Sequence, residues 1–272
     1  MENTNEELFL SNYNINSYEQ YSIATDIVAF SMNTKKEENY RQDPKNSLSL
    51  LLIKRGEYPY KDMWALPGGF LRGDETIEEC ACRESVEETG IFPSALINIG
   101  VFSKPNRDPR GRIISNAFLS VTDKISTNLH SENDAVSASW FNISFDYIDD
   151  LYILKLVNEQ DNIQAKLRMS PNKFGKIEFD IIENEKLAFD HASIIATAIT
   201  ILRKSAEKFD LIFDFLPEKF TLSELQNVQS IIINKPVLTA NFRRKISDYV
   251  IETDEYTSGA GHRPAKLFIR KI

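Results

Sequence analysis

Three glutamates in the last two turns of one short helix constrain this chain more than any other feature of its sequence. Residues 76–89 have a helical pattern, and at 100° per residue Glu84 and Glu88 continue the stripe of small and apolar side chains, with Glu87 on its flank. Carboxylates near a helix C-terminus oppose the helix dipole and repel one another. A solvated helix end would place them opposite the apolar stripe, so we interpret them instead as ligands of a hard divalent cation, which prefers oxygen donors.

The helix that carries these glutamates is well delimited and lies among predicted strands. Thr76 and Glu79 form a capping box at its start, and Gly90 stands where a left-handed residue ends a helix. Strands are predicted at residues 21–30, 48–53, 63–66, 97–102 and 113–121, and a further one ends at Trp140-Phe141. Strands and helices alternate without a βαβ period, which favours an α/β sandwich with a mixed sheet. We place Trp64 and Trp140 in its core.

The C-terminal part has a different order of elements. Helices are predicted at residues 186–209, 221–232 and 239–247, followed by strands at 249–253 and 266–270 around a glycine-containing turn. Asp190 is placed to cap the first helix, and Thr221 and Glu224 form a second capping box. Three helices followed by a hairpin are typical of a winged helix-turn-helix. We therefore expect a flexible segment 1–18, a domain 19–185 and a winged helix domain 186–272.

The formal net charge of −8 excludes a generally basic protein that coats nucleic acid, but the charge is divided unevenly. Residues 1–185 contain 19 basic and 30 acidic side chains, a net charge of −11, whereas residues 186–272 contain 13 and 10, a net charge of +3. The acidic excess therefore belongs to the part that contains the glutamate helix. The positive balance of the C-terminal part is compatible with nucleic acid.

The sequence also indicates the cellular compartment in which we expect the protein. The N-terminus, MENTNEELFL, is acidic and polar where a secretory signal is basic, and no uninterrupted apolar run approaches the ~18 residues of a membrane helix. Cys80 and Cys82 are separated by a single residue and cannot form a disulfide framework. We expect a reduced, cytoplasmic protein with no membrane partner.

The segment from Gly69 to Ile91 resembles the Nudix box, Gly-x5-Glu-x7-Arg-Glu-U-x-Glu-Glu-x-Gly-U, in which U is a bulky aliphatic residue. Every fixed position matches, and the one departure is Ser85 at a U position, which we interpret as a change in packing. The resemblance implies a Nudix α/β/α sandwich, so that the whole chain belongs to the α+β class. It also implies that Mg²⁺ or Mn²⁺ is bound by Glu84 and Glu88, with Glu87 as a further ligand and the carbonyl of Gly68.

Two further roles follow from the same resemblance. Glu75 would pair with Arg83 and support the loop against the helix. The family hydrolyses a nucleoside diphosphate linked to another moiety, and the base that takes the proton of the attacking water often lies outside the box. Here the candidate bases are Glu132 and Asp134 in a polar loop, or Glu84 itself.

Residues 58–69 and 108–115 are similar to segments of the ADP-ribose pyrophosphatase branch, whose reaction gives AMP and ribose 5-phosphate. In that case Arg110 or Arg112 binds the phosphates, and Tyr58 or Tyr60 contacts the adenine or the ribose. Such loops are as often simply solvated turns, so both interpretations stay open for each arginine.

The C-terminal part resembles the NrtR-type Nudix-related transcriptional regulators through LAFDHASIIATAI (187–199), LPEKFTLSELQ (216–226), NFRRK (241–245) and GHRPAKLF (261–268). In those proteins a Nudix domain senses or hydrolyses a nucleotide, and a winged helix binds operator DNA. The side chains that suit DNA here are cationic and lie on the third helix and the wing: Arg243, Arg244, Lys245, His262, Arg263 and Lys266. We expect Phe242 and Ile246 to be the buried contacts of that helix.

Three hypotheses therefore stand beside one another. The first is a Mg²⁺-dependent hydrolase of ADP-ribose whose winged helix binds DNA, the second a regulator whose Nudix domain binds an effector with little turnover, and the third an enzyme whose winged helix serves only dimerisation. The complete set of box carboxylates favours the first. By the resemblance we also expect a homodimer. His191 is interpreted as an ordinary residue of a first helical turn.

Overall fold

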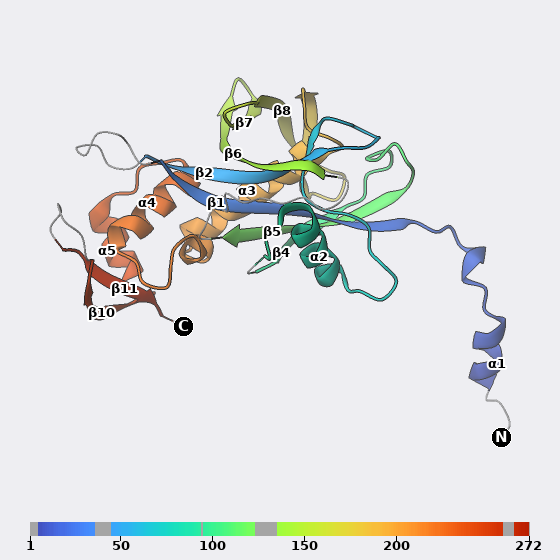
Figure 1. The fold of residues 1–272 in the computed structure, drawn as a ribbon, viewed down its shortest axis with the longest axis horizontal. Helices are drawn as coiled ribbons and strands as arrows, with labels where there is room; N and C mark the ends of the chain where they lie inside the picture. Colours follow the sequence, from blue (N-terminus) through green and yellow to red (C-terminus); the bar gives the residue numbers. More distant parts are fainter. Residues whose placement is uncertain (1–4, 36–44, 94, 123–134, 258–263, 272) are drawn as a thin grey trace.

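The computed structural model describes residues 5–35, 45–93, 95–122, 135–257 and 264–271. A long mixed sheet forms the body, and a small helical domain with a two-stranded hairpin lies at one end of it (Figure 1). In chain order the elements are α1 (Asn5–Asn12), η1 (Ile15–Ser17), β1 (Ser22–Lys35), β2 (Lys45–Arg55), β3 (Trp64–Ala65), α2 (Ile77–Thr89), β4 (Ile97–Phe102), β5 (Ile113–Thr122), β6 (Ala135–Ile148), β7 (Leu151–Val157), β8 (Asn162–Pro171), β9 (Ile177–Asn184), α3 (His191–Glu207), η2 (Leu211–Phe215), α4 (Leu222–Ile233), α5 (Thr239–Ile246), β10 (Val250–Tyr256) and β11 (Lys266–Arg270).

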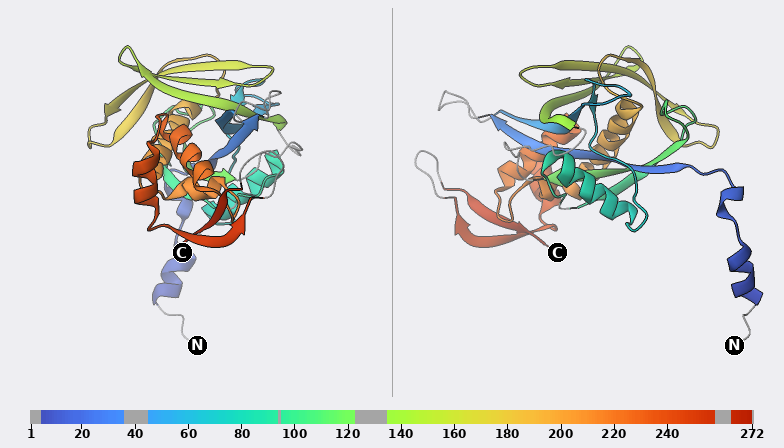
Figure 2. Two further views of the ribbon diagram at one scale, coloured as in Figure 1. Left: turned by 90° about the vertical axis from the view of Figure 1, so that its left-hand side faces the viewer. Right: turned by 45° about the vertical axis from the view of Figure 1, so that its right-hand side comes forward.

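The predicted mixed sheet is confirmed. Its strand order is β4-β5-β1-β2-β6-β7-β8-β9, and β3 pairs with β2 beside this path. β1 and β5 are parallel, whereas the other neighbours are antiparallel. The strands β6 to β9 curl over α3, which packs against β9 and β8 (Figure 2).

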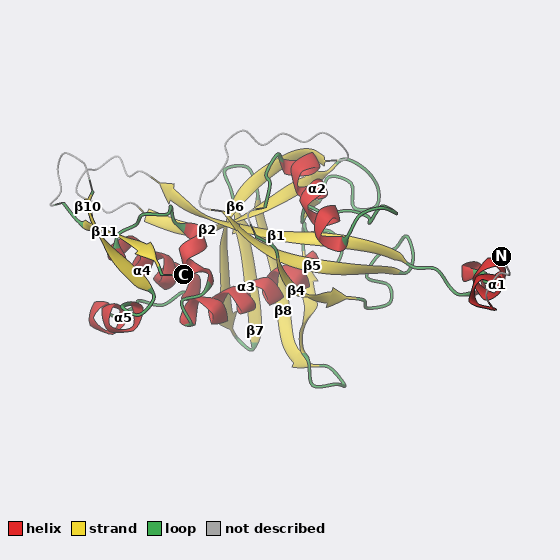
Figure 3. Ribbon diagram, turned by 90° about the horizontal axis from the view of Figure 1, so that it is seen from below, coloured by secondary structure: helices red, strands yellow, loops and turns green. Residues whose placement is uncertain are grey.

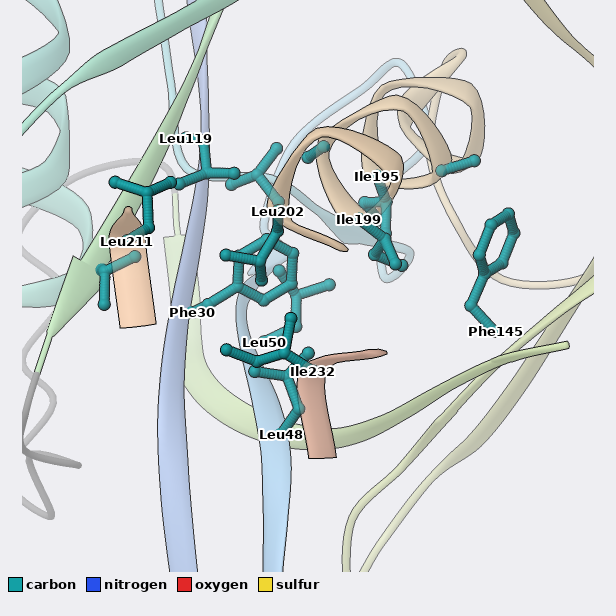
Figure 4. Packing of buried hydrophobic residues seen from close by; sticks show 14 of the residues in the cluster. Phe30, Leu48, Leu50, Leu119, Phe145, Ile195, Ile199, Leu202, Leu211 and Ile232 are labelled. Carbon is teal, nitrogen blue, oxygen red and sulfur yellow. The ribbon is translucent and has the colours of Figure 1, made fainter. Parts of the chain in front are cut away.

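The sandwich follows from the two-residue period of the central strands. On β1 and β2, Phe30 and Leu50 enter the core beneath α3, where they lie with Ile199 and Leu202 (Figure 4). Their neighbours, such as Leu51, enter a second core that contains Ala81 of α2. The two helices therefore cover opposite faces of the sheet (Figure 3), as the expected α/β/α arrangement requires.

Two predicted boundaries were wrong, and each has a local cause. The strand predicted to end at Phe141 continues to Ile148, and β7, β8 and β9 were not predicted at all. The β6–β7 turn is Asp149-Asp150, both with positive φ, instead of the Asn-Gly or Asp-Gly pair that signals such a hairpin.

Helix α3 begins at His191, five residues after the predicted start. Residues 186–188 instead lie beside β3, where the Trp64 N–H donates to the Lys186 carbonyl at 3.0 Å and the Ala188 N–H to the Trp64 carbonyl at 2.8 Å. Phe189 then turns the chain with a φ of 52°. These backbone hydrogen bonds keep the preceding residues out of the helix.

The N-terminal segment, expected to be flexible, contains α1 and η1, and all of their side chains are exposed. It extends away from the body (Figure 1). Along the described part of the chain, no helix combines the length and the apolar character that crossing a membrane requires.

The C-terminal elements form the predicted winged helix. Phe220 exchanges backbone hydrogen bonds with Phe268 of β11, so the residue before the N-cap of α4 is joined to the hairpin of β10 and β11 by an isolated bridge. Within this C-terminal part α4 packs directly on α3, since Gln229 of α4 donates its side-chain amide to the Ala206 carbonyl at 2.8 Å. Both predicted capping boxes are present, at Thr76 and at Thr221.

Candidate functional site

A tight turn at Pro67-Gly68-Gly69 stands at the centre of the site. It runs beside β1, where the Ile27 N–H donates to the Pro67 carbonyl at 2.8 Å and the Thr25 N–H to the Gly69 carbonyl at 2.9 Å. Gly68 has a φ of 155°, and a Cβ on it would lie 2.0 Å from the Thr25 carbonyl oxygen. Only glycine fits there, which explains why this sequence can bring a backbone so close to β1.

The carboxylates of α2 lie against this turn. Oε2 of Glu88, a residue only 7% exposed, accepts a hydrogen bond of 2.8 Å from the Gly68 N–H. The Glu84 carboxylate lies so near Gly69 that a Cβ there would be 2.3 Å from Oε1. Glu87 stands further out and pairs with Arg72 and Arg83, each at 3.4 Å. The three glutamates therefore meet the glycine turn as the sequence predicts, with Glu87 on the flank.

The predicted Arg83–Glu75 pair is present. Nη2 and Nε of Arg83 donate to the two oxygens of Glu75 at 2.7 and 2.9 Å, and Nη1 donates to Glu84 at 2.5 Å. The hydrogen bonds from Arg83 lower the pKa of Glu75 to about 2. Burial raises the pKa of Glu84 above its ordinary value despite the same arginine. One guanidinium thus ties the loop to the helix and offsets part of its acidic charge.

Ser85, the departure from the box, has a defined role in packing. It is buried, and its hydroxyl donates to the Ile91 carbonyl at 2.7 Å across the turn that follows the helix. Gly90 has the predicted left-handed conformation, with a φ of 70°. The hydroxyl therefore fastens this turn, which an aliphatic side chain would only pack against.

The donor set suits a hard divalent cation by its chemistry. Glu84 and Glu88 are one helical turn apart, lie against the adjacent glycines Gly69 and Gly68 respectively, and offer oxygen donors alone. Each carboxylate has its own protein partner, and within the described ranges no three His, Cys, Asp or Glu side chains are arranged to hold a metal ion. Among the candidate bases Glu84 lies at this turn, whereas Glu132 and Asp134 lie outside the described residues.

A basic cavity opens on the other side of the glycine turn. Arg110 lies with its guanidinium carbon 5.0 Å from the ring centre of Phe70 and 5.5 Å from that of Phe189, and Arg55 lies 5.0 Å from Phe189. The cavity is lined by Ala24, Thr25, Asp26, Arg55, Leu66, Gly68, Gly69, Phe70, Arg107, Asp108, Arg110, Ile113, Phe189 and His191. Guanidinium groups beside aromatic rings suit a phosphate-bearing ligand.

A buried charge network forms one wall of the basic cavity. Arg107, whose side chain is 5% exposed, donates to both oxygens of Asp190 at 2.7 and 3.0 Å and lies 3.4 Å from Asp26. Burial alone would raise the pKa of Asp26, but the interactions with His191 and Arg107 outweigh it and hold that pKa well below its ordinary value. The prediction that the Asp190 side chain caps α3 was wrong, since it makes no capping hydrogen bond and binds Arg107 instead.

Of the residues predicted to bind substrate, the structure brings Arg110 to the basic cavity. Arg112 instead donates to the Ser103 carbonyl at 2.5 Å and lies over the ring of Tyr21, and Tyr58 is 83% exposed. Tyr60 packs on Phe189 with ring centres 4.8 Å apart. The cavity residues that sequence reasoning missed are Arg55, Arg107, Asp26, Phe70 and Phe189. A sequence signal for part of this cavity was present in the segment 187–199, which contains Phe189, but we interpreted that segment only as part of the winged helix domain.

A second charged surface lies on α5. Phe242 and Ile246 are each 1% exposed, as predicted, and the cations between them, Arg243, Arg244 and Lys245, are all exposed. Lys266 of β11 pairs with Glu252 at 3.3 Å. His262 and Arg263, predicted for the wing, lie outside the described residues. The described cations of α5 thus form an open basic edge.

Comparisons with known proteins support both resemblances, that of the N-terminal part to Nudix proteins and that of the C-terminal part to a winged helix. The family model described as the NUDIX domain matches residues 40–145, and that described as the NrtR DNA-binding winged helix domain matches residues 212–269. The chain is 28% identical over 97% of its length, and 88% of the relative's, to the ADPR responsive transcriptional repressor NtrR of Acinetobacter baylyi.

It is also 45% identical to the ADP-ribose pyrophosphatase of Methanocaldococcus jannaschii, over 35% of this chain and 55% of that protein. Among solved structures, a MutT/nudix family protein from Enterococcus faecalis superposes with a TM-score of 0.77 at 25% identity, covering 99% of this chain and 94% of that one. The first family model contains the glycine turn and α2, and the second contains α5 and the hairpin.

Proposed function

Because a NUDIX domain model and an NrtR winged helix model match the two parts of this chain, we propose that it hydrolyses the diphosphate bond of ADP-ribose, giving AMP and ribose 5-phosphate, and binds operator DNA through the winged helix. One observation carries the hydrolytic half. The acidic face of α2 and the basic cavity meet at the same two residues, Gly68 and Gly69. A diphosphate placed over this turn would have arginines on one side and carboxylates on the other.

The resemblance to the Nudix box supports the carboxylates of α2 as the ligands of a divalent metal. Glu84 and Glu88, with Glu87 and the Gly68 carbonyl, would hold Mg²⁺ or Mn²⁺, which neutralises phosphate charge and activates water as a nucleophile. Arg55 and Arg110 would bind the diphosphate oxygens; both lie beside Phe189, and the Arg110 guanidinium is held by the two oxygens of Asp108 at 2.7 and 3.1 Å. Arg83 keeps Glu75 and Glu84 in register with the loop.

The DNA-binding half rests on the α5 surface. Its three exposed cations suit phosphate contacts, and the two buried side chains fix their orientation. We infer a homodimer, since operator recognition by winged helices uses two-fold symmetry. His262 and Arg263 complete the proposed surface, and the division into 1–18, 19–185 and 186–272 remains part of this proposal.

The relative that matches nearly the whole chain supports a second candidate function. It is named as a repressor responsive to ADPR, and a regulator needs only binding at the basic cavity, with little or no turnover. The two candidates share the cavity and differ in what happens to the diphosphate. Product analysis therefore separates them.

The test of hydrolysis is release of AMP from ADP-ribose in the presence of Mg²⁺. We expect Glu84→Gln to lower kcat by at least about 100-fold, because a metal ligand is lost while the shape is kept. Glu78→Gln, on the exposed face of the same helix, should leave turnover unchanged. Unaltered turnover in Glu84→Gln would refute the metal assignment.

Wild-type protein is also tested in a mobility-shift assay on DNA from its own gene neighbourhood. Retarded DNA is expected, and no shift at low salt would remove the DNA-binding half. If ADP-ribose alters the shift but is not cleaved, the regulator hypothesis replaces the hydrolase.

A further inference from the structure

His191 is the first residue of α3 and lies far from α2 in the sequence, yet it reaches the glycine turn. It is 4% exposed and lines the basic cavity. Neither the proposed metal ligands nor the proposed DNA contacts include it. The two hydrogen-bonding contacts of its ring indicate a structural role beside the glycine turn.

The first contact of His191 is with the backbone that enters the turn. Its Nδ1 accepts a hydrogen bond of 2.9 Å from the N–H of Leu66, a buried residue. The short pairing of β3 with residues 186–188 ends just before this point. The next residue, Pro67, has no N–H, and the next N–H, of Gly68, donates to Glu88. The imidazole therefore continues the pairing at the last donor before the glycine turn.

The second contact fixes the ring from the other side. Because Nδ1 accepts a hydrogen bond, the ring proton is assigned to Nε2, which lies 3.3 Å from Oδ1 of Asp26 on β1. Asp26 is itself held by the Ser115 hydroxyl and by Arg107. The ring of Phe189 packs at 5.2 Å. The two hydrogen-bonding partners of its nitrogens, together with the tilted ring of Phe189, define the orientation of the imidazole.

We propose that His191 is a positioning residue for the Nudix site. Its ring holds Leu66 at the right distance from β1 and so places two groups, the Gly68 N–H that orients Glu88 and the Gly69 backbone on which Glu84 lies. The inference rests on the proposed hydrolytic function. It assigns to the C-terminal side of the chain a part in arranging the carboxylates of α2.

Three substitutions separate the two contacts of the ring. Asparagine puts its Oδ1 at the place of Nδ1, so His191→Asn keeps an acceptor for Leu66. Glutamine puts its amide near Nε2, so His191→Gln keeps the group that faces Asp26 and loses the acceptor. His191→Ala loses both.

We expect His191→Ala and His191→Gln to lower kcat for ADP-ribose about 10- to 100-fold with KM nearly unchanged, the usual range for residues that orient ligands. His191→Asn should stay within about threefold of wild type. Asparagine and glutamine are equally polar and both leave part of the ring space empty, so a general packing defect would affect them alike. Equal loss in His191→Asn and His191→Ala, or no loss in His191→Ala, would overturn the proposal.

A second readout does not depend on turnover. Calorimetric titration of the full chain with Mn²⁺ alone should show affinity about 10-fold weaker for His191→Ala and His191→Gln, and unchanged for His191→Asn. Hydrogen exchange at the Leu66 amide should accelerate in the same two variants. A wild type that binds Mn²⁺ without hydrolysing ADP-ribose would contradict the proposed function. The Mn²⁺ affinities and the Leu66 exchange rates of the variants would then still test the role of His191. Identical Leu66 exchange in all four proteins would refute the role of His191.

Discussion

Helices α2 and α5 each carry three like charges close together in sequence, but the two sets differ in burial. On α2, Glu84, Glu87 and Glu88 are partly or wholly buried and each has a protein partner. On α5, the triplet of Arg243, Arg244 and Lys245 is exposed. The acidic set opposes its helix dipole near the C-terminus, whereas the basic set is in the last turn, where the dipole favours it.

The contrast shows two ways of preparing a surface for a charged ligand. The carboxylates are fixed by the glycine turn and by Arg83, so the site is shaped before anything binds, at a cost in repulsion. The cations of α5 remain solvated, which suits a DNA backbone that supplies many equivalent phosphates. Substitutions should therefore affect stability at α2 and affinity at α5.

The largest effect is expected at Gly68. Alanine there would place Cβ 2.0 Å from a backbone carbonyl at a φ of 155°, so β1 or the turn must shift. We predict that Gly68→Ala lowers the free energy of unfolding by about 3 kcal/mol or more, measured by urea denaturation. Gly73→Ala, in the same loop but with open space around it, should change it by less than about 0.5 kcal/mol. Equal stability of both variants would mean that the acidic site is not built on a strained turn.

A smaller effect, confined to binding, is expected on α5. Arg243→Ala combined with Arg244→Ala should weaken DNA binding about 10- to 100-fold and reduce the slope of log affinity against log salt by about 2. The free energy of unfolding should change by less than about 0.5 kcal/mol, because both side chains are exposed. The matched control removes two exposed cations of β7 and β8, Lys155→Ala with Arg168→Ala. If the control weakens DNA binding equally, the loss of affinity results from the total charge of the protein and not from the α5 surface.

The smallest effect concerns how the two helices begin. α2 starts with a complete capping box, whereas the N-cap of α5 is Leu238, which is 70% exposed and makes no capping hydrogen bond. Leu238→Ser should stabilise the protein by about 0.5 to 1 kcal/mol, since serine accepts a hydrogen bond from the first turn. Thermal unfolding of the variant beside wild type measures the gain. A loss of stability would show that Leu238 is needed for packing.

Sequence reasoning was most successful where the signal is local. The caps of α2 and α4, the faces of α2 and α5, and the Arg83–Glu75 pair depend on residues close to one another along the chain. The strands β7 to β9 were missed because their first turn lacks a glycine.

The basic cavity was missed for a different reason. It is assembled from segments separated by more than 100 residues, as in the contact of Leu66 with His191. Neither residue has a sequence pattern that predicts its partner. Asp190 stands at the N-cap position of α3, although its carboxylate binds Arg107. Only the folded chain shows that such residues share one wall.

The position of the first turn of α3 has a consequence for how this chain can be divided. A fragment ending at residue 185 would contain the whole Nudix box but would lack Phe189, Asp190 and His191, three residues of the cavity and its wall. An exchange of C-terminal domains between related proteins at that point would transplant part of the proposed nucleotide site together with the proposed DNA-binding surface. The shortest fragment that keeps the cavity lining intact must extend into α3, so recombination that preserves catalysis is expected to join chains beyond that helix.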